Sequence, residues 1–389
     1  MIERTPLRVA FTHISRRQWA GGYNYQRNLF AALDRHCPGE IAPVVFAGML
    51  DDANELAVLS GTPGVTVVQS PAFPAFDQRR RGLLLSLASG IDAAAMAEFR
   101  TMHVDVVFES ARFFGWRLPL PAIAWIPDLQ HRRHPELFSP FARWRRDLGF
   151  RAQIASGRHV MLSSESARRD CLAYYPGLSD RVSVVRFASQ PEPTLLAADP
   201  GKVVAQYGLP SAYFYLPNQF YPHKNHQLVL DALSILKGRG ADIVVAASGS
   251  KEDPRGPGYF DSLMKTVARR GLGQNFRYLG MIPLDHVYAL LRATTALVNP
   301  SRFEGWSTTV EEAKSFGVPT VISDIDVHRE QMGEEARYFG VDDAQALADH
   351  LSDVYRTSQP VVRNLLPKID ARVAAFAAGF ARVVRNAAS

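Results

Sequence analysis

The sequence lacks the features that mark secreted and membrane-spanning chains. Only two of its 389 residues are cysteine, Cys37 and Cys171, which are too few by themselves for a disulfide framework or a structural zinc site. No stretch of about 18 or more apolar residues occurs, and residues 1–6 lack the apolar core of a signal peptide. We therefore expect a cytoplasmic protein.

Several short catalytic motifs are also missing. The chain contains no Gly-x-Gly-x-x-Gly, His-Glu-x-x-His, Cys-x-x-Cys or Gly-x-Ser-x-Gly. The sequence therefore gives no motif that supports a dinucleotide-binding, zinc-hydrolase or serine-esterase function. Hydrophobic residues make up 47% and charged residues 21% of the chain, an ordinary globular composition that excludes a disordered or low-complexity protein.

Lysine is absent from the first 200 residues, and nine arginines gather in residues 131–169 against three acids. Such a patch attracts phosphate, either on a nucleotide-linked substrate or on an anionic membrane surface. The alternative is a solvated helix face whose arginine stems cover apolar surface. Nucleic acid is not an expected partner, because no recognition motif accompanies the charge. The nine are Arg132, Arg133, Arg143, Arg145, Arg146, Arg151, Arg158, Arg168 and Arg169.

Short β-branched runs alternate with helical patterns along the whole chain. This alternation predicts an α/β protein with parallel, doubly wound sheets. Ligands of such sheets bind outside the carboxyl ends of the strands, so the loops after the strands carry the chemistry. The expected strands are residues 7–14, 41–47, 65–69, 104–109, 122–126, 160–164, 182–187, 213–216, 243–248, 276–279, 296–299 and 320–323.

A proline-containing break at residues 189–194 divides these strands into two series. We expect two facing Rossmann-like domains with an interdomain cleft, formed by residues 1–190 and 191–369. The last segment, residues 370–389, predicts a helix with an apolar side, which we expect to pack back toward the N-terminal domain.

The densest polar and glycine-containing segment is residues 299–319. We expect a strand to end at its start, a loop to carry Glu304 and Gly305, and a helix to begin near Thr308. The first free amides of such a helix form an anion site, and glycine lets a ligand approach the backbone closely.

Two carboxylates in this helix have a simpler explanation as well. Thr308-x-x-Glu311 and Thr309-x-x-Glu312 both match the capping box, in which a threonine hydroxyl and a glutamate satisfy free amides at a helix start. Capping does not explain Glu304 or the Gly-Trp-Ser-Thr-Thr run that follows it.

Glu304 and Glu312 form a Glu-x7-Glu pair inside Phe-Glu-Gly-Trp-Ser-Thr-Thr-Val-Glu-Glu-Ala. Downstream come Gly-Val-Pro-Thr-Val-Ile-Ser-Asp and His328-Arg-Glu, and upstream residues 215–226 place a lysine after the first strand of the second series. In this order the motifs resemble the retaining glycosyltransferases of family four, which have the GT-B fold. The resemblance extends to bacterial sugar transferases of polysaccharide and lipopolysaccharide synthesis.

The resemblance implies a site for a nucleotide-diphosphate sugar donor, with no separate cofactor and no metal. It implies that Glu312 binds the ribose, Glu304 the sugar hydroxyls, and Lys224 the diphosphate leaving group. Backbone amides after Glu304 hold the sugar and distal phosphate, and the loop after Gly280 holds the base. The remaining donor-binding residues expected on this basis are Gly305, Trp306, Ser307, Thr308, Thr309, Met281 and Ile282.

Gln219 stands about where the family usually has an arginine, which removes one cation from the leaving-group site. Arg302 is a candidate replacement, although a surface arginine is the simpler interpretation. The pair Gly21-Gly22 follows the first strand, and we expect it to form a loop that approaches the donor phosphates.

On the acceptor side, residues 125–131 end a strand where family members often carry His-Asp. This chain has Asp128 and His131 there, and either is a candidate for assisting the acceptor. Asp128 is favoured, since His131 is equally explained as a structural loop residue. The later Asp324-x-Asp326 has the form of a metal-binding pair, but a turn rich in aspartate is expected at that position.

The predicted function is transfer of a sugar, with mannose favoured by the resemblance alone, from a nucleotide sugar to a glycan or lipid-linked glycan acceptor. The arginine-rich segment 131–169 predicts peripheral contact with the inner face of an anionic membrane. The alternatives are a nucleotide-sugar-binding scaffold with little turnover, and a GT-B epimerase or phosphorylase.

Overall fold

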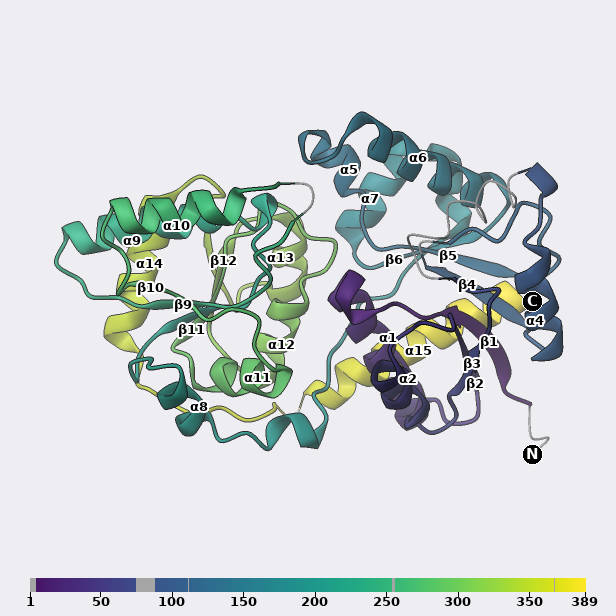
Figure 1. Cartoon of the computed structure of the whole chain (residues 1–389), viewed down its shortest axis with the longest axis horizontal. Helices are drawn as coiled ribbons and strands as arrows, with labels where there is room; N and C mark the ends of the chain where they lie inside the picture. Colours follow the sequence, from purple (N-terminus) through teal and green to yellow (C-terminus); the bar gives the residue numbers. More distant parts are fainter. Residues whose placement is uncertain (1–4, 75–87, 111, 254–255, 367) are drawn as a thin grey trace. The chain divides into compact units, whose positions relative to one another are not determined.

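The computed structural model describes residues 5–74, 88–110, 112–253, 256–366 and 368–389, and the chain divides into two compact units. Unit 1 comprises Met1–Arg133, Ser139–Ala188 and Asp370–Ser389. Unit 2 comprises His134–Phe138 and Ser189–Ile369. Each unit is built on one parallel sheet (Figure 1), which is the architecture that the strand–helix alternation predicts.

The sheet of unit 1 has seven parallel strands in the order β3-β2-β1-β4-β5-β6-β7. The strands are β1 (Leu7–Thr12), β2 (Ile41–Ala47), β3 (Thr66–Gln69), β4 (Val106–Ser110), β5 (Ala122–Ile126), β6 (His159–Leu162) and β7 (Val182–Val184). The helices are α1 (Arg16–His36), α2 (Ala53–Ser60), α4 (Ala93–Thr101), α5 (Gln130–Arg133), α6 (Pro140–Ala155), α7 (Glu165–Tyr174), η3 (Pro176–Arg181) and α15 (Ile369–Ala388).

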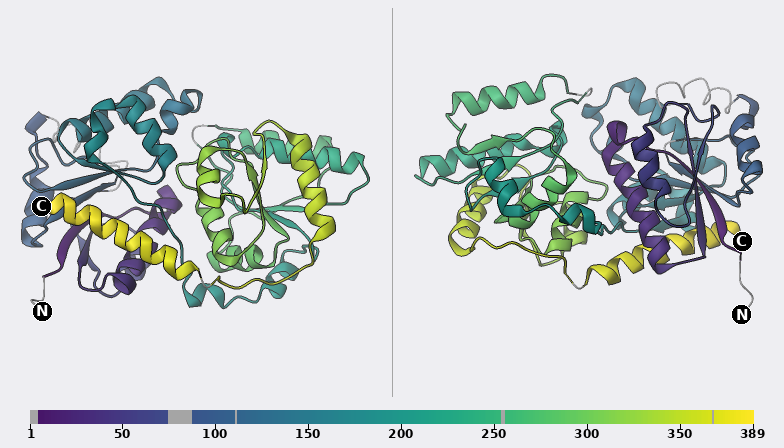
Figure 2. Two further views of the ribbon diagram at one scale, coloured as in Figure 1. Left: turned by 180° about the vertical axis from the view of Figure 1, so that it is seen from behind. Right: turned by 60° about the horizontal axis from the view of Figure 1, so that its bottom comes forward.

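Successive residues of β1 supply the cores on both faces of this sheet. Ala10 packs in a cluster with residues of α4, whereas Phe11 faces aromatic rings from α1 and α15. Its ring centroid is 4.9 Å from that of Phe30 and 5.9 Å from that of Phe380. The helix α15 thereby returns the end of the chain to unit 1, along which it lies in both views of Figure 2.

The sheet of unit 2 has six parallel strands in the order β10-β9-β8-β11-β12-β13. The strands are β8 (Phe214–Leu216), β9 (Val245–Ala247), β10 (Phe276–Tyr278), β11 (Ala296–Asn299), β12 (Thr320–Ser323) and β13 (Arg337–Phe339). The helices are η2 (Pro135–Leu137), η4 (Pro193–Leu196), α8 (Pro200–Gln206), η5 (Pro222–Lys224), α9 (His226–Gly238), α10 (Tyr259–Arg269), α11 (Leu284–Ala293), α12 (Thr308–Phe316), α13 (Asp326–Met332) and α14 (Ala344–Thr357).

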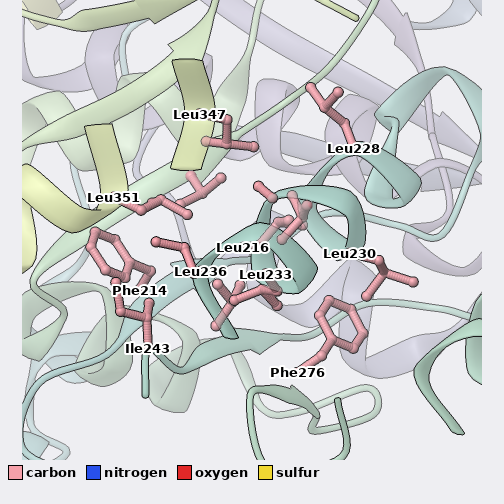
Figure 3. Packing of buried hydrophobic residues seen from close by; sticks show 14 of the residues in the cluster. Phe214, Leu216, Leu228, Leu230, Leu233, Leu236, Ile243, Phe276, Leu347 and Leu351 are labelled. Atoms are coloured by element: carbon pink, nitrogen blue, oxygen red, sulfur yellow. The ribbon is translucent and has the colours of Figure 1, made fainter. Parts of the chain in front are cut away.

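Period-two alternation divides the strands of unit 2 between two cores. Phe214 and Leu216 belong to the cluster under α9, α10 and α14, whereas Tyr215 belongs to the one under α8, α11 and α12. Figure 3 shows the first cluster, in which Leu233 and Leu236 of α9 meet side chains from β8 and α14. Because both faces are covered, the inner strands β8 and β9 are fully buried, whereas the edge strands β10 and β13 carry Arg277 and Arg337.

None of the described helices combines the length and the hydropathy needed to cross a membrane.

Candidate active site

The loops after two neighbouring strands of unit 2 bring Lys224 and Glu304 together. Lys224 ends η5, which follows β8, and Glu304 lies in the loop between β11 and α12. The lysine Nζ donates to Glu304 Oε1 at 2.6 Å, and Ser301 Oγ donates to the same oxygen at 2.7 Å. Both charged side chains are largely buried, at 15% and 9% exposed. The structure therefore pairs the two residues for which the sequence predicts contacts to leaving group and donor sugar.

Asn299, the last residue of β11, organises the polar side chains around this pair. Its Oδ1 accepts from the Ser301 N–H and from Asn218 Nδ2, each at 3.2 Å. Its Nδ2 donates to Ser307 Oγ at 2.9 Å and to Thr309 Oγ1 at 3.3 Å. One buried amide thus links the start of the loop to the start of α12.

The start of α12 differs from the predicted capping boxes. The N-cap residue is Ser307, and its side chain makes no cap bond, since its Oγ is engaged with Asn299. Gln331 of α13 instead accepts from the Ser307 N–H at 3.1 Å and donates to the Ser307 carbonyl at 2.9 Å. The prediction that Thr308 and Thr309 cap this helix is therefore wrong. The Ser307 amide, expected to face a phosphate, is already paired inside the protein.

Glu312 lies in the second turn of α12 with only 6% of its surface exposed. Burial raises its pKa to about 7, the Tyr288 hydroxyl opposes this by donating to Oε1 at 3.2 Å, and the carboxylate of Glu311 adds to the rise. The side chain therefore exchanges a proton near neutral pH rather than remaining a permanent anion.

A buried histidine close enough to Glu304 and Lys224 to feel their charges has no role in the sequence-based prediction. The His328 ring is fully buried, and its Nδ1 donates to the Ser323 carbonyl at 2.9 Å. Burial lowers its pKa, Glu304 acts in the opposite direction, and Lys224 adds to the lowering. Its Nε2 has no hydrogen-bond partner among the described residues. The available sequence signal is a histidine five residues after the end of a buried strand.

The loops after β8, β9 and β10 are tied to one another. The Gly249 N–H donates to the Gly280 carbonyl at 3.0 Å. Gly249 has φ of +150°, and a Cβ there would lie 2.4 Å from the Asn218 carbonyl oxygen, so only glycine fits. Of the residues predicted to hold the base, Met281 is 63% exposed, and Ile282 packs against the buried core.

The side chains of Gln219 and Arg302 are both bound to other groups of the protein. Gln219 Oε1 accepts from the Ser250 N–H at 2.6 Å, which braces the loop after β9. Arg302 is ion-paired with Asp342 at 2.5 Å. The simpler interpretation of Arg302, as a surface residue, matches this pairing.

Comparison with known proteins shows which protein family unit 2 resembles. Residues 208–364 match the family model described as glycosyl transferases group 1. This segment belongs to that family. The chain is 22% identical over 280 residues to the O-antigen chain mannosyltransferase B of Escherichia coli, an alignment covering 70% of this chain and 71% of that protein.

Solved structures share the fold over nearly the whole chain. A glycosyltransferase from Rickettsia africae ESF-5 matches with a TM-score of 0.67 at 14% identity, covering 99% of this chain and 95% of that one. Anabaena Alr3699/HepE, in complex with UDP and glucose, matches with a TM-score of 0.64 at 15% identity, covering 98% and 97%. The predicted family resemblance, the two-domain α/β GT-B fold and the transferase activity are thus confirmed.

In unit 1 of this glycosyltransferase, the predicted glycine loop is wrong. Gly21 and Gly22 lie inside α1, just after a kink at Trp19, where φ and ψ are −154° and 87°. A Cβ on Gly22 would lie 2.4 Å from the Trp19 indole. The glycines are therefore explained by packing against that indole.

Asp128 and His131 follow β5, as the sequence predicts, but their surroundings differ. Asp128 Oδ1 accepts from the Gln130 N–H at 2.9 Å and so helps to start α5. The His131 ring is buried, its Nε2 lies 2.9 Å from Asp147 Oδ1 of α6, and burial lowers its pKa. This placement matches the structural interpretation of His131, so Asp128 remains the candidate for assisting the acceptor.

The arginine-rich segment of the glycosyltransferase is less cationic than its composition suggests. Arg158 is buried and pairs with Glu109 of β4 at 3.3 Å. Others are ion-paired as well, among them Arg132 with Asp147, Arg133 with the buried Asp170 and Arg168 with Glu165. The exposed surface of α6 also carries an aromatic pair, Phe141 and Trp144, at 64% and 58% exposure and with 6.0 Å between ring centroids.

Asp324 of the Asp-x-Asp pair forms a two-pronged ion pair with Arg329, at 2.7 and 2.8 Å, and Asp326 begins α13. Among the described residues, no group of three or more His, Cys, Asp or Glu side chains is arranged to hold a metal ion.

Proposed function

We propose that the chain is a retaining glycosyltransferase that moves a hexose, mannose in the first instance, from a nucleotide-diphosphate sugar to a glycan or lipid-linked glycan. The observation that carries this proposal is the Lys224–Glu304 pair beside the start of α12. An ammonium next to free helix-end amides stabilises a departing diphosphate, whose negative charge grows as the bond to the sugar breaks. The named similarity to an O-antigen mannosyltransferase supports mannose and surface polysaccharide synthesis.

Retention of configuration fits the state of Glu304. Its Oε1 already accepts from Lys224 and Ser301, and a carboxylate oxygen held in this way is a weak nucleophile. The acceptor hydroxyl then attacks on the face that the diphosphate leaves, and Asp128 is the proposed residue that assists it. The donor site needs no metal in this mechanism, because Lys224 and the amides of α12 supply the charge.

A thermal-shift panel of GDP, UDP, ADP and their hexose conjugates tests the donor site. One nucleotide should raise the melting temperature of the wild type, and Glu312→Ala should lose that gain because the ribose contact is removed. Glu335→Ala, which removes an exposed carboxylate outside the motifs of the site, is the matched control. If no nucleotide shifts the wild type at millimolar concentration, the donor site is refuted.

Gln219 supports a second candidate function, that of a protein that binds a nucleotide sugar with little or no turnover. Gln219 is neutral and its side chain is engaged with the Ser250 N–H. The diphosphate would therefore be neutralised by Lys224 without the arginine that the family usually has at the position of Gln219. A nucleotide-sugar-binding scaffold would bind the sugar nucleotide and release no nucleoside diphosphate. Lys224→Met in a transferase should lower turnover by about 100- to 1000-fold, as expected for the loss of one preorganised charge. Lys202→Met should leave turnover unchanged.

The exposed surface of α6 supports a further part of the proposal, peripheral binding to an anionic membrane. Phe141 and Trp144 supply apolar groups that suit the interface, and each basic residue near the surface adds about 1 kcal/mol. Vesicles containing phosphatidylglycerol should retain the protein at low salt, whereas pure phosphatidylcholine vesicles should not. Phe141→Ala with Trp144→Ala should weaken the retention, and Trp116→Ala should not. Binding that is indifferent to phosphatidylglycerol contradicts this part.

A further inference from the structure

A stack of aromatic rings stands at the carboxyl end of β5 in unit 1. Trp125, one residue before the end of the strand, stacks on Tyr25 with ring centroids 4.2 Å apart and on Trp19 with centroids 5.3 Å apart. Tyr25 and Trp125 are buried, but Trp19 is 38% exposed. The exposed indole is thus held in a fixed plane by rings that are themselves locked in the core.

The backbone around Trp19 is shaped to leave room for this indole. Its non-helical φ and ψ interrupt α1, so the ring is set apart from the ordinary helical side-chain positions. The second and third residues after Trp19 are glycines: a Cβ at Gly22 would lie 2.4 Å from the indole Cε3, and one at Gly21 would lie 3.2 Å from its Nε1. The local sequence therefore holds one exposed ring in place.

Three buried polar atoms, on α1, β5 and the neighbouring strand β4, have no hydrogen-bond partner among the described residues. They are Tyr25 Oη, Trp125 Nε1 and Ser110 Oγ. Ser110 and Trp125 are partners in the register of β4 and β5, at the carboxyl ends of both strands. Buried polar groups are nearly always paired, so unpaired ones indicate a ligand or ordered water. In doubly wound sheets, this end of the strands is where ligands bind.

We propose that Trp19 is the platform on which a pyranose ring of the acceptor stacks, and so a specificity-determining residue of the transferase. The inference rests on the proposed function, because it assigns the acceptor to unit 1. A pyranose suits the site because it presents a face of C–H groups, whose hydrogens are attracted to the electron-rich face of an indole. Its hydroxyls, directly or through water, are suitable partners for the unpaired atoms.

The five tryptophans allow a direct test by NMR of the indole N–H groups in the full-length protein. Trp116 and Trp144, at 56% and 58% exposure, serve as internal controls that are more exposed than Trp19. The probes are methyl α-D-mannopyranoside and methyl β-D-galactopyranoside at roughly 50 mM, well above a millimolar dissociation constant. Glycerol is the hydroxyl-bearing compound without a ring face. We expect at least one sugar to move the Trp19 signal saturably and to leave both control signals unmoved.

Variants separate stacking from folding. Trp19→Phe keeps an aromatic face and should keep most of the binding, whereas Trp19→Ala should weaken it roughly tenfold, as expected for the loss of one aromatic contact. Gly22→Ala keeps the indole but displaces it, and should weaken binding similarly. All three should melt as single folded species with the wild-type shift on adding nucleotide, which reports on unit 2 alone.

Three results would overturn the platform: no saturable shift at Trp19, equal shifts at all three exposed indoles, or unchanged sugar binding by Trp19→Ala. A wild type that binds these sugars but no nucleotide would refute the proposed function and leave the sugar platform standing.

Discussion

At the scale of single residues, the ionisation of Glu312 follows from its burial. Its folded-state pKa of about 7 lies above the ordinary value of about 4.3 for an unfolded chain. The folded state therefore favours the protonated form of Glu312 more strongly than the unfolded chain does. Its contribution to stability is complete below the unfolded pKa and is lost as pH rises through the folded pKa.

Glu312→Gln should therefore stabilise unit 2 increasingly as pH rises from about 4.5 to 8, relative to wild type. The gain should approach about 4 kcal/mol, since each pKa unit corresponds to about 1.4 kcal/mol. The glutamine oxygen can still accept from Tyr288, so the comparison isolates the charge. Denaturant unfolding of both proteins across this pH range measures it, and a difference that does not vary with pH would show that Glu312 is ionised throughout.

At the scale of elements, the buried pair of Glu109 and Arg158 joins β4 to the residue before β6. Glu109 is fully buried, and burial raises its pKa while Arg158, the Phe114 N–H and Gln153 act in the opposite direction. Arg158 also donates to the Gly115 carbonyl at 2.7 Å. An arginine placed in this way determines structure rather than surface charge.

Arg158→Ala should destabilise the protein by about 3–5 kcal/mol, because it leaves a carboxyl group buried without its counterion. Arg151→Ala, from the exposed part of the same segment, should change stability by less than about 0.5 kcal/mol. Denaturant midpoints of the two variants provide the comparison. Equal midpoints would mean that Glu109 is protonated in the fold and needs no cation.

Most strands and the α12 segment could be predicted from sequence, because apolar runs of Val, Ile and Ala lie between polar turns. The three-residue β13 was missed, since Arg337 is exposed and the run is too short to show a period. The prediction of the residues that cap α12 was wrong for a different reason. Gln331 lies 24 residues beyond Ser307, and no local pattern reveals that its amide replaces the threonine caps.

The same limit explains the other differences at the site. Gly21-Gly22 has the composition of a loop, but the pair lies inside α1 and packs against the indole of Trp19. Nothing in the sequence distinguishes the buried Arg158 from its eight neighbours in the cluster. The proximity of Lys224 and Glu304 could be predicted from the sequence, because the carboxyl ends of adjacent parallel strands meet at one edge of a sheet.

At the scale of the whole molecule, α15 links the end of the chain to the fold of unit 1. Phe380 is fully buried, and its ring centroid is 5.5 Å from that of Phe108 and 5.9 Å from that of Phe11. The helix is therefore part of the core of unit 1 although it follows unit 2 in sequence.

Phe380→Ala should cost unit 1 about 3–5 kcal/mol through the cavity that it leaves. Unit 2 has its own cores, so calorimetry should show one transition moving to lower temperature while the nucleotide-dependent transition stays in place. Arg382→Ala, on an exposed position of α15, is the control. A single transition that moves as a whole would show that the units unfold together.

The absence of lysine before residue 202 gives this two-unit molecule an unusual chemical asymmetry. All seven lysine side chains lie in unit 2, so a reagent selective for side-chain amines labels one unit and leaves the other untouched. Lys224, held by Glu304, should react more slowly than exposed lysines and become further protected when a diphosphate covers it. Mass-spectrometric footprinting of amines thus reports on occupancy of the donor site without any engineered label.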